Sequence, residues 1–352
     1  MNLSLRSPAP APDLSEARTP AGFSLVELLV SMGIFALVVV MIAGMAARTQ
    51  DVTSRVTGQV YQFKEARSAF EAITQKLSQA TLQTYWDYEY ATSGGRQIPL
   101  RYVPQSELRF VTGQAPELLS EATAPPSHAV FFTAPLGFSN DDEYREFSGL
   151  LNAWGYYLEF SDGSRFQPPF VSEFGSTWQP RYRFRLIEYR QPSEELSIYR
   201  QPPGSNEWFS NREPLFCRVV AENIIAMVIQ PLESRADVER RNQTFGGNAT
   251  VTSIAPNYSY DSANPSLPPS SRHQLPPLVR VTLVALDEGA AARLEDGATQ
   301  PVLVEPGWFT NAANYESDLA QLEQSLRDQR LGYRVFSSTV ALRAAKWTPR
   351  GG

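Results

Sequence analysis

The longest apolar run of the chain lies near its beginning, from Leu28 to Ala47, and it contains neither a charged residue nor a proline. A helix rises by about 1.5 Å per residue, so about twenty residues give roughly 30 Å, the thickness of the hydrocarbon core of a bilayer. The run therefore predicts a transmembrane helix over residues 23–47. No second apolar stretch approaches this length, so the remainder is expected on one side of the membrane.

Beyond this run, apolar residues recur every three or four positions, which is the pattern of a helix with one buried face. They are Val52, Val56, Val60, Phe63, Ala66, Phe70, Ile73, Leu77 and Ala80. No proline interrupts Phe23 to Thr84, which allows one continuous helix, and residues 48–90 are predicted as its amphipathic continuation. A coiled coil could show a similar stripe, but packing against the chain's own sheet is favoured. The helix is expected to be least stable at Gly44 and Gly58, since a glycine lowers helix stability by about 1 kcal/mol relative to alanine.

From Tyr85 onward, short runs of β-branched and aromatic residues alternate with Gly, Pro, Ser and Asn clusters, as in antiparallel sheets. Strands are predicted at 107–111, 129–133, 155–160, 182–189, 224–229, 278–286 and 333–342, with a short helix at 317–329 and an irregular stretch at 233–277. Arg183 and Arg185 alternate with apolar residues and are expected to face water. The predicted fold class is α+β, with a long N-terminal helix packed on an antiparallel sheet in a head of residues 91–352.

Composition and charge exclude some classes of function. The net charge is −6 and the pI about 5.2, so no polybasic surface is expected and nucleic-acid binding is not predicted. Cys217 is the one cysteine, cannot form an intramolecular disulfide, and is expected to be buried as a small hydrophobic residue. Residues 1–22 are rich in Pro, Ala and Ser and are predicted to be a disordered leader.

Groups that could carry chemistry are few. His128 and His273 have no ligand-spaced partner and are expected in solvated loops. No catalytic motif occurs, so neither an enzymatic activity nor a cofactor is predicted. The acidic run Asp141-Asp142-Glu143 could contribute to a calcium site, but it lacks the glycine and alternate oxygen ligands of a calcium loop. A plain acidic turn is the preferred interpretation, and no metal site is predicted.

Two further groups of residues leave alternatives open. Trp86, Trp154, Trp178 and Trp208 could fill the core beneath a sheet or form an exposed surface for a carbohydrate or a partner. Asn242, Asn248 and Asn257 begin triplets that match glycosylation acceptors. Such triplets arise easily in loops rich in Asn, Ser and Thr, so glycosylation is not the favoured interpretation.

The segment Gly22-Phe23-Ser24-Leu25-Val26-Glu27 resembles the processing site of type IV pilin-like proteins. This resemblance implies that a prepilin peptidase cleaves after Gly22 and methylates the new amino group of Phe23, leaving Glu27 as the fifth residue. It further implies that Glu27 pairs with the terminal ammonium of a neighbouring subunit, so that two charges costly in lipid satisfy each other. The implied partners are other pilin or pseudopilin subunits, an inner-membrane assembly platform and membrane lipid, with the head periplasmic.

Later segments extend this resemblance in outline. The strand after Pro276-Pro277 and the final strand with Phe336, Val340 and Leu342 resemble the C-terminal half of J-type minor pseudopilins. Residues 63–70 and 85–88 are similar to Verru_Chthon cassette protein C. The resemblance implies a minor subunit of a type II secretion pseudopilus or type IV pilus-like filament.

Two other classes of function stay open. One is a single-pass, membrane-tethered binding module that never polymerises. The other is an exported enzyme on the same anchor. An ordinary secretory signal, cleaved near Gly44-Met45-Ala46, is the competing interpretation of the N-terminal segment.

Overall fold

The computed structural model describes residues 25–119, 125–167, 181–202, 205–246, 252–267, 272–295 and 297–347. For residues 46–62 and Phe245 the description covers the backbone alone. The predicted leader, residues 1–22, and Phe23 lie outside the described residues. The chain divides into two compact units, Met1–Arg55 and Val56–Gly352, and each is considered separately below.

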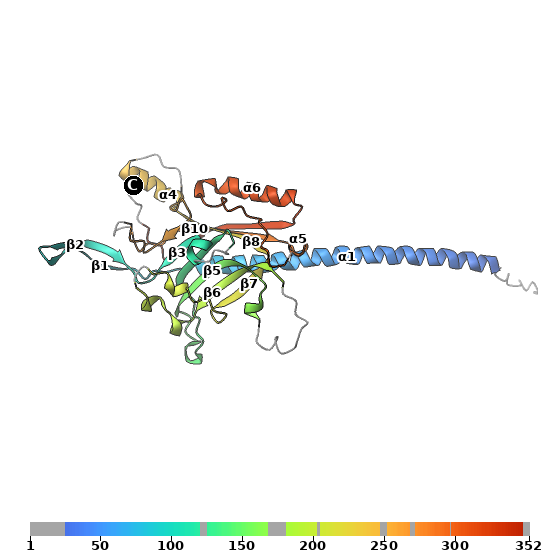
Figure 1. The fold of residues 1–352 in the computed structure, drawn as a ribbon, viewed down its shortest axis with the longest axis horizontal. Helices are drawn as coiled ribbons and strands as arrows, with labels where there is room; N and C mark the ends of the chain where they lie inside the picture. Colours follow the sequence, from blue (N-terminus) through green and yellow to red (C-terminus); the bar gives the residue numbers. More distant parts are fainter. Residues whose placement is uncertain are drawn as a thin grey trace, which may run out of the picture. The chain divides into compact units, whose positions relative to one another are not determined.

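Helix α1 runs without interruption from Leu25 to Leu77 (Figure 1). It ends at Leu77 rather than at the predicted Thr84, because the chain turns toward a strand. The amides of Gln79 and Ala80 bond three residues back, which tightens the last turn. The next amide, of Thr81, then donates to Thr133 O at 2.8 Å. The predicted amphipathic segment 48–90 therefore overran the helix and included the start of a strand at Tyr85.

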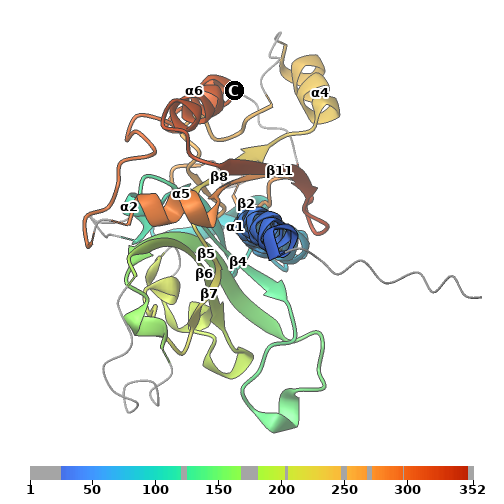
Figure 2. The same ribbon diagram turned by 90° about the vertical axis from the view of Figure 1, so that its right-hand side faces the viewer.

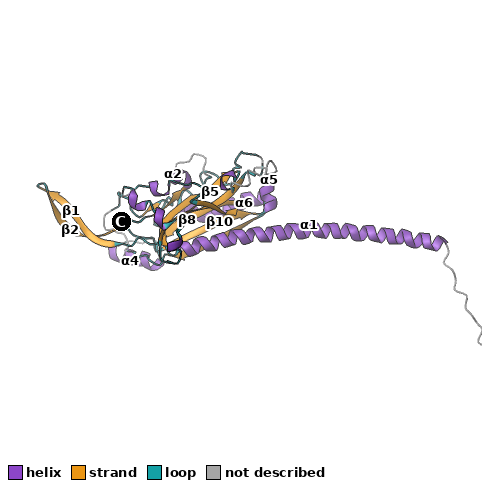
Figure 3. Cartoon of the chain, turned by 90° about the horizontal axis from the view of Figure 1, so that it is seen from below, coloured by secondary structure: helices purple, strands orange, loops and turns teal. Residues whose placement is uncertain are grey.

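The described residues of the second unit form antiparallel sheets of six, three and two strands. The six-stranded sheet has the order β7-β6-β5-β4-β3-β9, with β3 Phe110–Gln114, β4 His128–Pro135, β5 Leu151–Ser161, β6 Arg183–Gln191, β7 Cys217–Glu222 and β9 Tyr260–Asp261. The three-stranded sheet has the order β11-β10-β8, with β8 Ile224–Leu232, β10 Leu278–Leu286 and β11 Tyr333–Ala341. A separate hairpin, β1 Tyr85–Ser93 with β2 Arg96–Gln105, projects from the other strands (Figure 3).

The two larger sheets form two layers, and helix α6, Tyr315–Asp328, covers the outer face of the three-stranded sheet (Figure 2). Successive side chains of a strand point to opposite faces of the sheet, so alternate residues of β10 pack into two different cores. Val281 and Leu283 join the core shared with α1 and the six-stranded sheet, while Val284 and Leu286 join the core beneath α6. Burial on both faces explains why β10 is almost entirely apolar.

Shorter helices complete the second unit. They are α2 Ala115–Leu119, α4 Arg235–Phe245 and α5 Glu288–Arg293, with 3-10 turns at Asp142–Tyr144, Ser164–Phe166, Ser193–Glu195, Ile198–Arg200, Glu207–Phe209 and Ala312–Asn314. The stretch 233–277 was predicted to be irregular, but it contains α4 and β9. Helix α4 begins where the Ser234 hydroxyl accepts from the Asp237 amide at 3.1 Å, which is an N-cap.

The α+β class, the antiparallel sheet and the helix at 317–329 are confirmed, as is the burial of Cys217. Each of the seven predicted strands corresponds to an observed one, although 107–111 is displaced toward Phe110–Gln114. The expectation for Arg183 and Arg185 is wrong. Their exposed fractions are 4% and 5%, because carboxylates and carbonyl groups on neighbouring elements enclose both guanidinium groups.

Candidate assembly and processing site

The apolar part of α1, Leu25–Met45, spans 21 residues, and its most apolar window of 18 residues has a mean hydropathy of 2.7. None of its most apolar window is buried inside the protein, and its large side chains are exposed, for example Phe35 at 70%. By length and composition this helix can cross a membrane. Such an exposed apolar surface is suited to lipid or to other apolar helices.

Glu27 is the sole ionisable residue of the segment Leu25–Met45, and it lies in the first turn of α1. The partial positive charge of a helix N-terminus favours a carboxylate at this position. The other polar side chain nearby, Ser31, donates to Leu28 O at 2.9 Å and so satisfies its own hydroxyl within the helix. Gly22 and Phe23 lie outside the described residues, so the structure positions Glu27 but not the cleavage site.

The last turns of α1 belong to the second unit and are built into its core. Ala66, Ala69, Ile73 and Leu77 are buried, at intervals of three and four residues, in the cluster formed by both large sheets. Phe70 lies beside Phe336 of β11, with ring centroids 6.0 Å apart. This confirms, for the part of the stripe from Phe63 onward, the prediction that it packs against the chain's own sheet.

A buried ion pair holds the same end of α1. Lys76 Nζ lies 2.6 Å from Glu188 Oε1 on β6, and Glu188 is 1% exposed. Glu188 also accepts from Trp154 Nε1 at 2.9 Å, Tyr156 OH at 2.7 Å and Arg218 Nε at 2.5 Å. Lys76 further lies over the Trp154 ring, 4.2 Å from its centroid. Four donors therefore converge on one buried carboxylate.

This environment keeps Glu188 ionised. Burial is the largest single influence and by itself raises the pKa of Glu188. Hydrogen bonds from Lys76 and Tyr156 and the charges of Lys76 and Arg218 outweigh it, so the pKa of Glu188 falls below its usual 4.5. This cluster could not be predicted from sequence spacing, because its members are scattered between Lys76 and Arg218.

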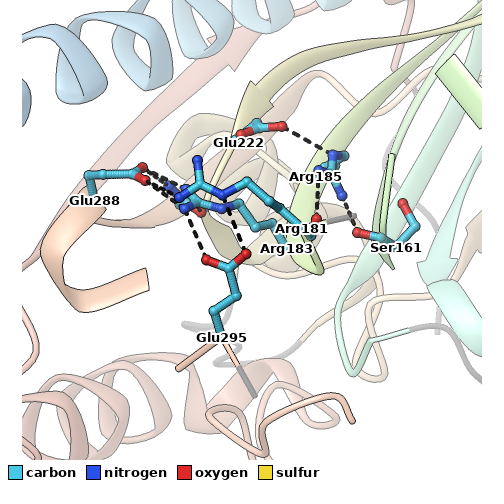
Figure 4. A network of polar contacts seen from close by, with 8 residues as sticks. Ser161, Arg181, Arg183, Arg185, Glu222, Glu288 and Glu295 are labelled. Carbon is cyan, nitrogen blue, oxygen red and sulfur yellow. Dashed lines mark hydrogen bonds and ion pairs between the residues drawn. The ribbon is translucent and has the colours of Figure 1, made fainter. Parts of the chain in front are cut away.

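A second charged network joins β6 to α5 and β7 (Figure 4). The two terminal nitrogens of Arg183 donate to the two carboxylate oxygens of Glu288, at 2.6 and 2.5 Å. One of these nitrogens also lies 3.4 Å from Glu295 Oε2. Arg185 pairs with Glu222 at 3.1 Å. The hydrogen bond from Arg183 is the main reason that the pKa of Glu288 is lowered. These contacts satisfy charges within the head and fix α5 to the sheet.

His128, expected in a solvated loop, is fully buried in β4. Its Nδ1 accepts from the Ile229 amide at 2.9 Å, and its Nε2 lies 3.0 Å from Phe309 O. An accepting Nδ1 requires the neutral ring with its proton on Nε2. Burial lowers the pKa of His128 from 6.5 to about 4, which agrees with that assignment. His128 is therefore a core residue that links three segments.

Other residues singled out in the sequence take different positions. His273 is half-buried in a loop with φ of 54°. The carboxylate of Asp141 accepts from the Glu143 amide at 2.9 Å, and Asp142 pairs with Arg145 at 2.9 Å, both in an exposed turn. Over the described ranges, no three His, Cys, Asp or Glu side chains are grouped as metal ligands would be.

The tryptophans divide between the two interpretations. Trp154 and Trp208 are buried, Trp86 is 71% exposed, and Trp178 lies outside the described residues. Asn242 lies on α4 and Asn257 in a loop, whereas Asn248 is also outside the described residues.

Comparison with known proteins bears on the N-terminal segment alone. The family model of the prokaryotic N-terminal methylation motif matches residues 18–43, a range that includes Gly22, Phe23 and Glu27. No curated protein and no solved structure matches the chain. The chain thus carries a prepilin-type methylation motif followed by an apolar helix and an antiparallel sheet head.

Proposed function

We propose that this chain is a minor pilin-like or pseudopilin-like subunit, processed by a prepilin peptidase and assembled through α1 into a filament. The observation that carries the proposal is the coincidence, in one segment, of the methylation motif, Glu27 and an exposed apolar helix of 21 residues. The filament is a type II secretion pseudopilus or a type IV pilus-like fibre. Its inner-membrane assembly platform and other pilin subunits are the partners.

In this mechanism the peptidase hydrolyses the bond between Gly22 and Phe23 and methylates the new amine. Placing the Glu27 carboxylate in lipid costs on the order of 3 kcal/mol, and this cost is lowered by a cation. The ammonium of Phe23 in a neighbouring subunit supplies it, and each charge removes the penalty of the other. The apolar helices then bundle as the filament core, with the head on the periplasmic side of the inner membrane.

A minor position in the filament suits the large head and the single cysteine. Residues 91–352 are bulky for a repeating unit, and one cysteine cannot close a loop near the C-terminus. Within the minor class, the pattern of the later segments resembles that of the J-type pseudopilins and of the Verru_Chthon cassette proteins. The role proposed is structural, in assembly, rather than catalytic.

The test compares Glu27→Ala with Ser31→Ala in cells that assemble the filament. Ser31 lies one turn further along the same apolar helix and is hydrogen-bonded within it, so its loss removes a polar group without removing the charge. Glu27→Ala is expected to be cleaved and methylated normally but to be depleted from sheared filaments, while Ser31→Ala assembles like the wild type.

Two results would contradict the docking role of Glu27. One is normal incorporation of the Glu27→Ala subunit. The other is recovery of the wild-type protein only as a monomer in the membrane, with its leader retained, which would favour a tethered binding module.

A further inference from the structure

The β1–β2 hairpin extends beyond the other strands of the second unit, and aromatic residues gather on one of its faces (Figure 3). Residues two apart in a strand, and residues paired directly across two strands, lie on the same face of a sheet. Trp86, Tyr88 and Tyr90 alternate along β1, and Tyr102 of β2 is paired with Tyr88. These four rings therefore share one face, which is called the aromatic face below.

Three of the rings contact one another. The centroid of the Tyr88 ring lies 4.2 Å from that of Tyr102 and 6.1 Å from that of Tyr90, so Tyr90 stays on the same side despite the β-bulge that follows Glu89. The hydroxyl groups of Tyr88 and Tyr102 are hydrogen-bonded to each other. Because these two rings meet across the strands, they fill the space between β1 and β2 and form a platform rather than a groove.

The charged residues of the hairpin occupy the alternate positions and lie on the opposite face. They are Asp87, Glu89, Arg96 and Arg101. Glu89 Oε2 and Arg101 Nε are paired at 2.6 Å, so two of these charges balance each other. The aromatic face itself therefore carries none of the hairpin's charges.

The opposite face also meets the head at the foot of the hairpin. Tyr85 and Gln105, on that face, line a cavity of about 750 Å³ whose wall includes Arg109, Trp208 and His273 from other segments. The aromatic face is open to solvent instead. The exposed fractions of its rings are 71% for Trp86, 58% for Tyr102, 50% for Tyr90 and 40% for Tyr88.

The size and shape of the aromatic face favour an extended chain molecule over a protein surface. An aromatic side chain presents about 150 to 250 Å², so four rings at these exposures leave about 300 to 500 Å². A stable protein interface uses about 800 Å² from each partner. The platform is two strands wide, and its rings follow β1 over roughly 13 Å from Trp86 to Tyr90. A strip this small and narrow suits a linear ligand.

The chemistry of the aromatic face favours a neutral sugar chain. The flat faces of the rings suit the C–H faces of sugars, while tyrosine hydroxyl groups donate and accept hydrogen bonds as sugar hydroxyl groups do. A proline-rich peptide, by contrast, lacks N–H donors at its prolines and docks into grooves between aromatic rings. The contact between Tyr88 and Tyr102 closes such a groove here. With the charges on the opposite face, an acidic chain gains no ion pair.

We propose that the aromatic face of the β1–β2 hairpin binds an extended neutral oligosaccharide, with sugar rings stacked on Trp86 and Tyr90 and sugar hydroxyl groups bonded to the tyrosine hydroxyl groups between them. This inference goes beyond the assembly role and does not rest on it. It gives the head a recognition function of its own.

The test uses the full chain in an amine-oxide detergent, which carries no sugar headgroup, and titrates it calorimetrically with cellohexaose, mannohexaose and N-acetylchitohexaose. At least one hexasaccharide is expected to bind about tenfold more tightly than its own disaccharide, because a disaccharide cannot reach from Trp86 to Tyr90. Hexagalacturonate, which is acidic, and decaproline are expected to bind more weakly than that neutral hexasaccharide.

Variants of the two faces provide matched controls. Tyr90→Ala and Trp86→Ala are each expected to weaken binding of the hexasaccharide by about tenfold, whereas Trp86→Phe keeps a flat ring and should stay within about threefold of the wild type. Tyr85→Ala removes a tyrosine of the same exposure as Tyr90, 50%, from the opposite face of the same hairpin, and should bind like the wild type. An unchanged midpoint of thermal unfolding would show that each variant is folded.

Absence of binding by all three neutral hexasaccharides at millimolar concentration would overturn the proposal. Equal losses in Tyr90→Ala and Tyr85→Ala would also do so, because they would remove the distinction between the faces. Tighter binding of hexagalacturonate or of decaproline would replace it with an anion site or a peptide site. None of these outcomes bears on cleavage or on filament assembly, so the two proposals stand or fall separately.

Discussion

Replacing Glu188 by glutamine tests how α1 is fixed to the head. The substitution keeps the volume of the side chain and removes the negative charge. Four groups donate to this carboxylate, including Lys76 on α1 and Arg218 on β7. Lys76 then loses its carboxylate partner in a site where its side chain is 22% exposed. The expected result is a less stable head whose final α1 turn opens more readily.

The size of the effect follows from burial. Removing one partner of a buried ion pair costs about 3 to 5 kcal/mol, because the other charge is left without compensation. Arg218 is 49% exposed and recovers water when Glu188 is neutralised, which favours the lower end of that range. We expect Glu188→Gln to lower the free energy of unfolding by about 3 kcal/mol, a large part of the roughly 5 to 15 kcal/mol typical of a domain.

The assay is urea unfolding of the full chain in detergent, followed by tryptophan fluorescence. Every tryptophan lies beyond residue 85, so the signal reports on the head rather than on the apolar helix. Glu71→Gln is the matched control, since Glu71 also forms an ion pair on α1, with Arg67, but both side chains are more than 60% exposed. Such a pair contributes about 0.5 kcal/mol or less.

Acid titration adds a second signature of the same cluster. The pKa of Glu188 is lower in the folded protein than its ordinary 4.5, so its stabilising effect is complete above that value. The effect is lost as the pH falls below 4.5 and through the lower folded pKa. The stability difference between wild type and Glu188→Gln should shrink over that range. Equal stability of Glu188→Gln and Glu71→Gln at neutral pH would show that the buried ion pair does not stabilise the head.

Two further substitutions probe the core. Folding lowers the pKa of His128 from 6.5 to about 4, so acidification between these values should cost about 3 kcal/mol of stability, and His128→Gln should flatten that part of the pH profile measured by urea unfolding. Gly155→Ala would place a methyl group against the Phe131 ring and 2.9 Å from Val130 O, and should destabilise the head by about 1 to 3 kcal/mol in the same assay. Gly149→Ala, where the added carbon meets nothing within 4 Å, is the control and should change stability little. A flat pH profile in the wild type would contradict the first expectation, and equal effects of the two alanines the second.

Helix α1, strand β10 and helix α6 could be predicted from local sequence patterns. A charge-free run, a two-residue alternation and a leucine spacing of three and four residues each reflect packing along one element. The hairpin β1–β2 was missed although Trp86, Tyr88 and Tyr90 alternate with acidic residues before Gly94-Gly95, both of which have positive φ. The two-residue period and the glycine turn indicate a hairpin. They were overlooked because the predicted helix was extended to residue 90.

What could not be predicted depends on contacts between distant segments. Arg183 and Arg185 alternate as surface residues do, yet Glu288 and Glu222 arrive from α5 and β7 to enclose them. His128 follows two prolines, as loop histidines do, yet Ile229 and Phe309 bond it within the core. The cavity beside the hairpin likewise gathers Arg109, Trp208 and His273 from separate stretches. The spacing of residues along the sequence carries no information about such contacts between distant segments.

Entry of the chain into the prepilin pathway is tested by the mass and N-terminal sequence of the membrane-extracted protein. The protein would be expressed with an active prepilin peptidase, with an inactive one, and as Gly22→Leu with the active enzyme. A chain that begins at N-methylated Phe23 is expected only for the natural sequence with the active peptidase. A chain that still begins at Met1 in all three cases, or one cut near Ala46, would contradict it.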